Sequence, residues 1–175
     1  IRPQKHFDII TYTGQSTSSL YNVTGLEFAP DFVWAKARND TIGHIFIDTV
    51  RGDDKQLNCP DYSAEVTRGT PSYRFLKDGF AVSTGGNMNN PQNYAAWCWK
   101  AGGSSNTYNI DGTGYGTASA AGLDGGTIDP TGASINTEAG FSIITYTGNG
   151  SAGSTIAHGL GKKPVWRLIK RRDAS

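Results

Sequence analysis

The loop that reads GGNMNNPQNY gathers the polar side chains best suited to hold a small ligand. It supplies Asn87, Asn89, Asn90, Asn93 and Tyr94. Sugar-binding sites combine such amides with aromatic rings, so these five residues form a candidate glycan site. An ordinary polar loop is the alternative, because asparagine also serves wherever the backbone enters the left-handed region.

Two other pairs of side chains could bind a cation or react as thiols. Asp53 and Asp54, in the stretch RGDDK, offer hard oxygen ligands for a metal such as calcium, and a solvated turn is the favoured interpretation. Cys59 and Cys98 have no CxxC or HxxxH companion, so neither a metal site nor a disulfide framework is predicted. Cys98 lies between two tryptophans and is expected to be a buried free thiol; a bond between the two cysteines is left open.

Catalytic arrangements are missing from the sequence. Glycosidases need two carboxylates about 5 to 10 Å apart across the sugar bond. The only glutamates of residues 1–100 are Glu27 and Glu65, each isolated, and no ExDxE-like run occurs. No G-x-S-x-G elbow marks a nucleophile. We therefore expect no catalytic residues, no enzyme activity and no cofactor.

The elements that must position these residues are β-strands. Glycine occurs 23 times, and Thr, Tyr, Val and Ile are plentiful, a balance typical of strands and turns. Alternation of apolar and polar residues predicts strands over the segments 7–13, 20–28, 32–37, 42–50 and 94–100. The expected fold class is therefore all-β, an antiparallel β-sandwich of the jelly-roll or concanavalin-like kind.

Two finer expectations follow from the strand assignments. The stretch YRFLKDGFAVST predicts a hairpin in which Asp78 and Gly79 supply the positive φ of a tight turn. The sequence also predicts how the sandwich core is built. We expect the face shared by Trp97 and Trp99 to stack on the face shared by Phe32 and Trp34.

An internal repeat divides the chain. FDIITYTG at 7–14 returns as FSIITYTG at 141–148, and the match continues at an offset of 134 with 12 identities in 35 positions. The predicted domains are a complete sandwich repeat at 1–100, a Gly/Ser/Thr-rich connector at 101–140, and the incomplete start of a second repeat at 141–175. The chain is thus expected to be a fragment of a longer tandem-repeat protein.

Charge and hydropathy argue against two classes of partner. The net charge is +1, and the basic run IKRRD aligns in the repeat with AKARND, so we interpret it as a strand end and expect no nucleic-acid binding. No apolar run approaches the roughly 20 residues of a membrane span, so no membrane insertion is expected.

The order of several motifs resembles the repeating domains of bacteriophage tail-fibre and related virion proteins. These motifs are HFDIITYTG, LEFAPDFVWAKAR, DTVRG, DGFAVSTGGNMNN, YAAWCWKAGG and FSIITYTGNGSAGSTIAHGLGKKP. The resemblance implies a fold similar to the concanavalin-type lectin sandwich and a structural or adhesive role in the virion, in host attachment. It also implies other virion subunits as partners, in a homo-oligomer such as a trimer. A carbohydrate-binding, lectin-like module that contacts a host surface glycan is the alternative.

Overall fold

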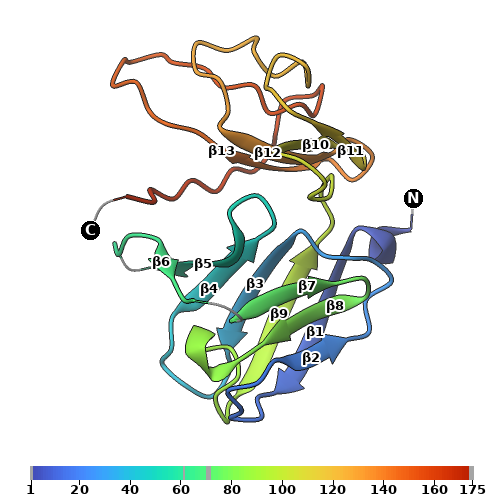
Figure 1. The fold of residues 1–175 in the computed structure, drawn as a ribbon, viewed down its shortest axis with the longest axis vertical. Helices are drawn as coiled ribbons and strands as arrows, with labels where there is room; N and C mark the ends of the chain where they lie inside the picture. The colour runs from blue at the N-terminus through green and yellow to red at the C-terminus, as the bar shows by residue number, and fades with distance from the viewer. Residues whose placement is uncertain (1, 61, 70–71, 174–175) are drawn as a thin grey trace.

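Two β-structured units follow one another along the molecule. The computed structural model describes residues 2–60, 62–69 and 72–173, and the first unit lies below the second in Figure 1. The only helical pieces in these ranges are two 3-10 turns, η1 at Pro3–Lys5 and η2 at Thr84–Gly86. The all-β class predicted from composition and alternation is therefore confirmed.

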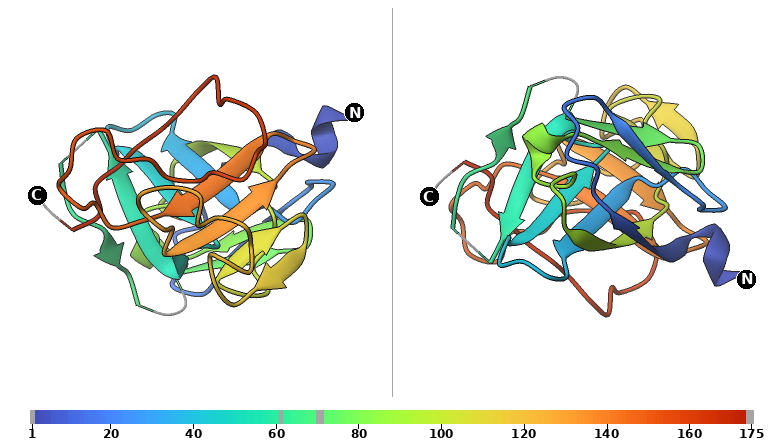
Figure 2. Two further views of the ribbon diagram at one scale, coloured as in Figure 1. Left: turned by 90° about the horizontal axis from the view of Figure 1, so that it is seen from above. Right: turned by 90° about the horizontal axis from the view of Figure 1, so that it is seen from below.

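The first unit is a sandwich of two antiparallel sheets. The larger sheet has the order β1-β9-β3-β4-β5-β6, and the smaller has the order β2-β8-β7. The small sheet covers one face of the large one (Figures 1 and 2). The predicted antiparallel sandwich is thus confirmed. The strands of the first unit are β1 (Phe7–Thr13), β2 (Tyr21–Thr24), β3 (Phe32–Ala37), β4 (His44–Asp48), β5 (Gly52–Cys59), β6 (Val66–Thr67), β7 (Tyr73–Leu76), β8 (Gly79–Val82) and β9 (Asn93–Trp99).

The sandwich core is built from the small residues of the central strands, not from their tryptophans. Ala96 and Cys98 of β9 and Val33 and Ala35 of β3 are buried against Phe80 and other residues of the small sheet. The predicted stacking of tryptophan faces is wrong. Neighbouring side chains on a strand point to opposite faces, and the large side chains of the small sheet leave room only for small partners opposite them.

Phe32 pairs with Trp99, and Trp34 pairs with Trp97, across the β3–β9 ladder. Directly paired residues project from the same face of a sheet. These aromatic side chains therefore lie together on the face of the large sheet that turns away from the core.

Local boundaries differ from expectation at two places. Asp53 and Asp54 lie within β5 rather than in a turn, since the strand begins at Gly52. The hairpin of β7 and β8 turns through Lys77 and Asp78, because Leu76 pairs with Gly79. Neither Asp78 nor Gly79 has the positive φ that the sequence predicts for this turn. Gly79 is needed for close approach instead: an added Cβ would lie 2.0 Å from the carbonyl oxygen of Val23 on β2.

The second unit is a four-stranded sheet with a small core of its own. Its order is β11-β10-β12-β13, with β10 and β12 parallel and the other pairs antiparallel. Leu123 and Ile135 are fully buried in its core beside Tyr108 and Ala133. The strands are β10 (Tyr108–Ile110), β11 (Thr113–Tyr115), β12 (Gly132–Asn136) and β13 (Phe141–Thr145).

This second sheet crosses the boundary expected at residue 140. The stretch 101–140, expected to be a connector, supplies β10, β11 and β12, and the start of the second repeat supplies β13. The widely spaced apolar residues of the glycine-rich stretch explain the difference. Leu123 and Ile135 come together in one buried cluster, which also contains Tyr108, Ala118 and Ala133.

The second copy of the repeat does not fold like the first. β13 is the counterpart of β1, but the described residues 146–173 contain no strand, only an isolated bridge between Ile128 and Ile156. Arg167 and Arg171 stand at the repeat positions of Val33 and Ala37, which are buried in the first unit. A charged side chain cannot be buried there without a partner, so this segment cannot form a second β3.

Aromatic stacking and one buried carboxylate join the two units. Phe141 of β13 stacks on Trp99, with ring centroids 5.8 Å apart and planes 17° apart. Asp31, just before β3, accepts hydrogen bonds from the Ala101 amide at 2.7 Å and the Gly103 amide at 3.3 Å. Burial raises the pKa of Asp31, against the opposing effect of these amides.

Replacement of Gly79 by alanine should destabilise the sandwich by about 2–3 kcal/mol, since the new methyl group must push β8 away from β2. Gly116→Ala is the matched control, because an added Cβ there meets nothing within 4 Å and the residue has no positive φ. Urea unfolding followed by tryptophan fluorescence measures both free energies. Equal stability of the two variants would contradict the assignment of Gly79 to close packing.

Candidate functional site

The candidate glycan loop lies between β8 and β9, and Asn89 is its structural anchor. The Asn89 side chain is fully buried. Its Oδ1 accepts the Gln15 amide at 2.7 Å, and its Nδ2 donates to the carbonyl and hydroxyl oxygens of Thr17, each at 3.1 Å. These three side-chain hydrogen bonds all go to the loop that follows β1, and the buried amide is not presented to solvent.

Tyr94 is equally committed to packing. It is fully buried and stacks on Tyr12, with centroids 5.0 Å apart and planes 12° apart. Its hydroxyl donates to the carbonyl oxygen of Asn87 at 3.1 Å, and burial raises its pKa. The ring therefore cannot serve as a platform for a sugar.

The other three asparagines keep exposed surface. Asn87 has a left-handed backbone with φ 59°, and Asn90 is half-buried. Asn93 is exposed, although its Oδ1 accepts the Thr13 hydroxyl at 2.9 Å. The structure brings these three side chains to one end of the sandwich without an aromatic face exposed among the five candidate residues.

The aromatic groups gather elsewhere, on the outer face of the large sheet. We call this surface the outer aromatic face. Trp34 lies 5.6 Å from Trp97 and 5.3 Å from Phe46, centroid to centroid. Its members are Phe7, Phe32, Trp34, Phe46, Trp97 and Trp99. The signal that could have located this face is the alternation in FVWAKA and YAAWCWK, which places large and small side chains on opposite sides.

A polar contact orients the central tryptophan. Trp34 Nε1 donates to Nδ1 of His44 at 2.7 Å. Partial burial, assisted by the charge on Lys36, lowers the pKa of His44. His44 is consequently neutral near pH 7, which leaves Nδ1 free to accept this hydrogen bond.

The second unit covers one end of the outer aromatic face and leaves the other end exposed. Phe141 of the second unit covers Trp99 and lies 6.1 Å from Phe32. Trp34 and Trp97 remain half-buried, and the neighbouring Ile9 is 49% exposed. The uncovered end is thus an apolar surface open to solvent.

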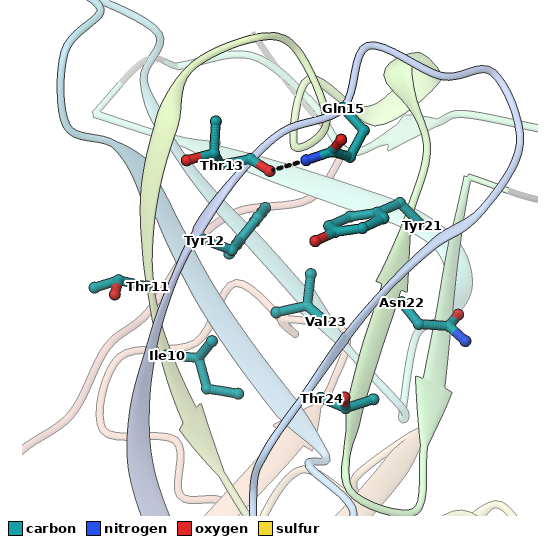
Figure 3. A pocket seen from close by; sticks show the side chains of 9 residues that line it. All are labelled: Ile10, Thr11, Tyr12, Thr13, Gln15, Tyr21, Asn22, Val23 and Thr24. Atoms are coloured by element: carbon teal, nitrogen blue, oxygen red, sulfur yellow. Dashed lines mark hydrogen bonds between the residues drawn. The ribbon is translucent and has the colours of Figure 1, made fainter.

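Two hollows lie outside this face. A cleft of about 640 Å³ separates the units and is bordered by His6, Lys100 and Glu138. A groove of about 350 Å³ lies at the open side of the sandwich, between β1 and β2. Figure 3 shows Tyr12, Tyr21 and Val23 in its middle, Ile10 to one side and threonines along its margins.

The structure does not assemble a metal site or a disulfide from the candidate aspartates and cysteines. Asp53 is exposed, and Asp54 lies 3.6 Å from Lys55 Nζ. Within the described ranges, no group of three or more His, Cys, Asp or Glu residues could hold a metal ion. Cys59 and Cys98 are both free thiols, and burial raises the pKa of Cys98 to about 12, so this thiol is unreactive.

An ion-pair network holds the last described residues against the first unit. We call residues 162–173 the C-terminal strap. Arg172 binds the Glu65 carboxylate with two nitrogens at 2.9 and 3.0 Å, and the Glu65 amide donates to the Arg172 carbonyl at 2.7 Å. Glu65 also accepts from Arg51, whose Nε contacts Asp48 at 2.5 Å. The strap is therefore attached beside β6, at one edge of the large sheet.

The same contacts set the ionisation of Glu65. Burial favours its neutral form, but hydrogen bonds from Arg172 and Arg51 outweigh burial, and the pKa is lowered from its ordinary value of 4.5. Glu65 is thus ionised at neutral pH and bound by two guanidinium groups.

The chain belongs to a family described as a domain of unknown function (DUF7483), and the match covers residues 2–175. No curated protein and no solved structure matches the chain. No helix among the described residues is long and apolar enough to cross a membrane.

Attachment of the strap should depend on pH. Because the pKa of Glu65 is lower in the folded chain, its stabilising contribution is complete above about pH 4.5 and is lost as the pH falls through the lowered pKa. Hydrogen exchange of the Glu65 amide, corrected for intrinsic rates, should therefore accelerate in acid. Arg172→Gln should expose the same amide at neutral pH; unchanged protection in this variant would contradict the assignment.

Proposed function

We propose that this chain is a non-catalytic structural and adhesive component of a bacteriophage virion, located in a tail fibre. It acts there as a spacer and as a host-surface contact, with other copies of the chain and other virion subunits as partners. The observation that carries the proposal is the ordered set of motifs from HFDIITYTG to YAAWCWKAGG, followed by the repeated FSIITYTG. Tandem β-units of this kind suit an extended appendage.

The joint between the units supports a stiff spacer. Stacked aromatic rings and a buried carboxylate that accepts backbone amides both cross the joint. Such a joint resists bending because separation would expose the Trp99 ring to water and leave buried polar groups without partners.

The carboxylates support a role without catalysis. Glu27 is paired with Arg2 at 3.0 Å, and Glu65 is paired with Arg51 and Arg172. Both carboxylates are therefore neutralised by arginine, whereas sugar hydrolysis requires two carboxyl groups free to act on the glycosidic bond.

A virion role predicts that the chain co-purifies with particles. Antibodies raised against the folded chain should decorate the tails of gradient-purified phage that encode it, because a fibre module is exposed along its length. Immunogold electron microscopy measures this, with an antibody against a non-virion phage protein as the control. Absence of the chain from purified particles would overturn the proposal.

A carbohydrate-binding module is the second candidate, and the uncovered end of the outer aromatic face favours it. Sugars stack on half-exposed aromatic rings beside polar groups. Trp97 and Trp34 offer such rings. The polar groups are Thr11 and Lys36, which pair with Ala95 from either side, two residues before Trp97 on β9.

Binding of a host glycan should then require Trp97 more than the asparagine loop. On an array of bacterial surface glycans, Trp97→Ala should lower the signal at least tenfold, a loss of about 1.4 kcal/mol. Asn90→Ala should lower it less. The reverse ranking would move the site to the loop, and a silent array for the unaltered chain would leave the spacer role as the whole function.

A further inference from the structure

The C-terminal strap displays an apolar segment that the rest of the described chain leaves largely exposed. Val165 is 105% exposed, Ile169 74%, Trp166 59% and Leu168 46%. No backbone hydrogen bond joins residues 164–169 to another described residue. We call residues 164–169 the exposed segment. Contiguous apolar surface of this kind commonly marks an interaction site.

Its sequence suits an edge strand. Trp166 and Leu168 project to one side of an extended chain, and Arg167 projects to the other. An arginine is excluded from the middle of a sandwich but is well suited to a strand with one face in water. The segment can thus add to the edge of a sheet with its tryptophan and leucine inward.

The free edge of β1 offers the complementary partner. The Lys100 amide donates to His6, and the Gly14 amide donates to Gln92, so the even-numbered residues of β1 bond to β9. In an antiparallel ladder the odd-numbered residues then direct their N–H and C=O groups away from β9. The large sheet therefore ends in a row of outward backbone groups.

Side chains satisfy part of this row and leave its centre open. The Ile9 amide donates to the Asp8 carboxylate at 2.8 Å, and the Thr13 carbonyl accepts from Gln15 Nε2 at 3.0 Å. Thr11, between them, has no such side-chain or loop partner among the described residues. Its outward N–H and C=O are the pair that an incoming strand would meet first.

Space for the incoming side chains lies next to this edge. The groove of about 350 Å³ between β1 and β2 has Ile10, Tyr12 and Val23 in its lining. Figure 3 shows these three side chains at the open side of the sandwich, with the threonines, Asn22 and Gln15 around them. Trp166 and Leu168 of an added strand would fill this groove.

The exposed segment cannot reach the β1 edge of its own chain. β1 and β6 form opposite edges of the large sheet, and Arg172 holds the strap beside β6. In Figure 1 the C-terminus and β1 lie on opposite sides of the molecule. An intramolecular contact is thus excluded, and the partner to which we assign the segment is a second copy.

Net charge favours contact between copies in general, although no charged side chain of the described residues lines the β1–β2 groove itself. Residues 162–175 contain six of the 16 Lys and Arg residues and one of the 15 Asp and Glu residues, which gives them a net charge of +5 and residues 1–161 a net charge of −4. A basic strap and an acidic body attract one another between copies. The attraction should weaken as salt screens it.

We propose that the exposed segment of one copy adds as a strand to the β1 edge of the next copy, with Trp166 and Leu168 in the β1–β2 groove. Such a contact joins two different surfaces, and we expect it to continue head to tail from copy to copy, into a ring or a filament. The inference rests on the geometry of donor and acceptor and does not depend on the phage role.

Sedimentation velocity of the full chain tests the contact. We expect the weight-average mass to rise with concentration beyond that of a dimer and to fall with added salt. Trp166→Ser with Leu168→Ser should abolish this growth. The matched control, Val165→Ser with Ile169→Ser, removes apolar surface from the other side of the same segment and should retain it.

The acceptor is tested by Thr11→Pro, which removes an outward N–H and leaves the bonds to β9 intact. Thr11→Lys serves the same purpose if the proline variant does not fold. Each acceptor variant and the donor double variant should be monomeric alone. Mixed, one acceptor variant and the donor variant should form dimers and nothing larger, since only one productive contact is left.

Three results would overturn the proposal. One is a wild-type chain that stays monomeric at every concentration and salt. Another is equal loss of assembly in the donor variant and its matched control. The third is a mixture of donor and acceptor variants that remains monomeric although both are folded by circular dichroism.

Discussion

The ladder between β3 and β9 is the interaction on which the rest of the molecule depends. On one side of it, small residues such as Val33 and Cys98 make room for the large side chains of the three-stranded sheet. On the other side, Trp34 pairs with Trp97 and Phe32 with Trp99. One register thus sets the sandwich core, the outer aromatic face and, through Phe141, the contact with the second unit. A shift of one residue would exchange the two faces and destroy all three.

The repeat shows how similar sequences reach different structures. FDIITYTG and FSIITYTG are identical at seven of eight positions, and each contains a strand, β1 in the first and β13 in the second. The counterpart of β3 does not, because arginine stands where Val33 and Ala37 are buried. The second copy has therefore kept the opening strand, which joins a new sheet with β12, and its later residues extend along the edge of the first unit.

The candidate site could be predicted only in part, and Asn89 and Tyr94 show why. A polar loop with an aromatic neighbour was apparent from the sequence. Whether an amide faces solvent or the loop after β1 depends on a contact between residues 72 or more positions apart, such as Asn89 with Thr17. Local pattern carries no information on such a contact. Alternation places the aromatic residues on one face of each strand but does not say which face is covered, so the sequence alone predicts them in the core.

The sequence by itself determined the all-β class, the positions of most strands, the central β3 among them, and the internal repeat. These features follow from local alternation and turn residues, which act within a few positions of the chain. The tertiary structure alone decided which face of β3 and β9 became the core, how the glycine-rich stretch joined β13 in a sheet, and which asparagines stayed exposed. The two faces of an alternating strand are equivalent until a second sheet covers one, and the volume of side chains on that second sheet selects the face with small residues.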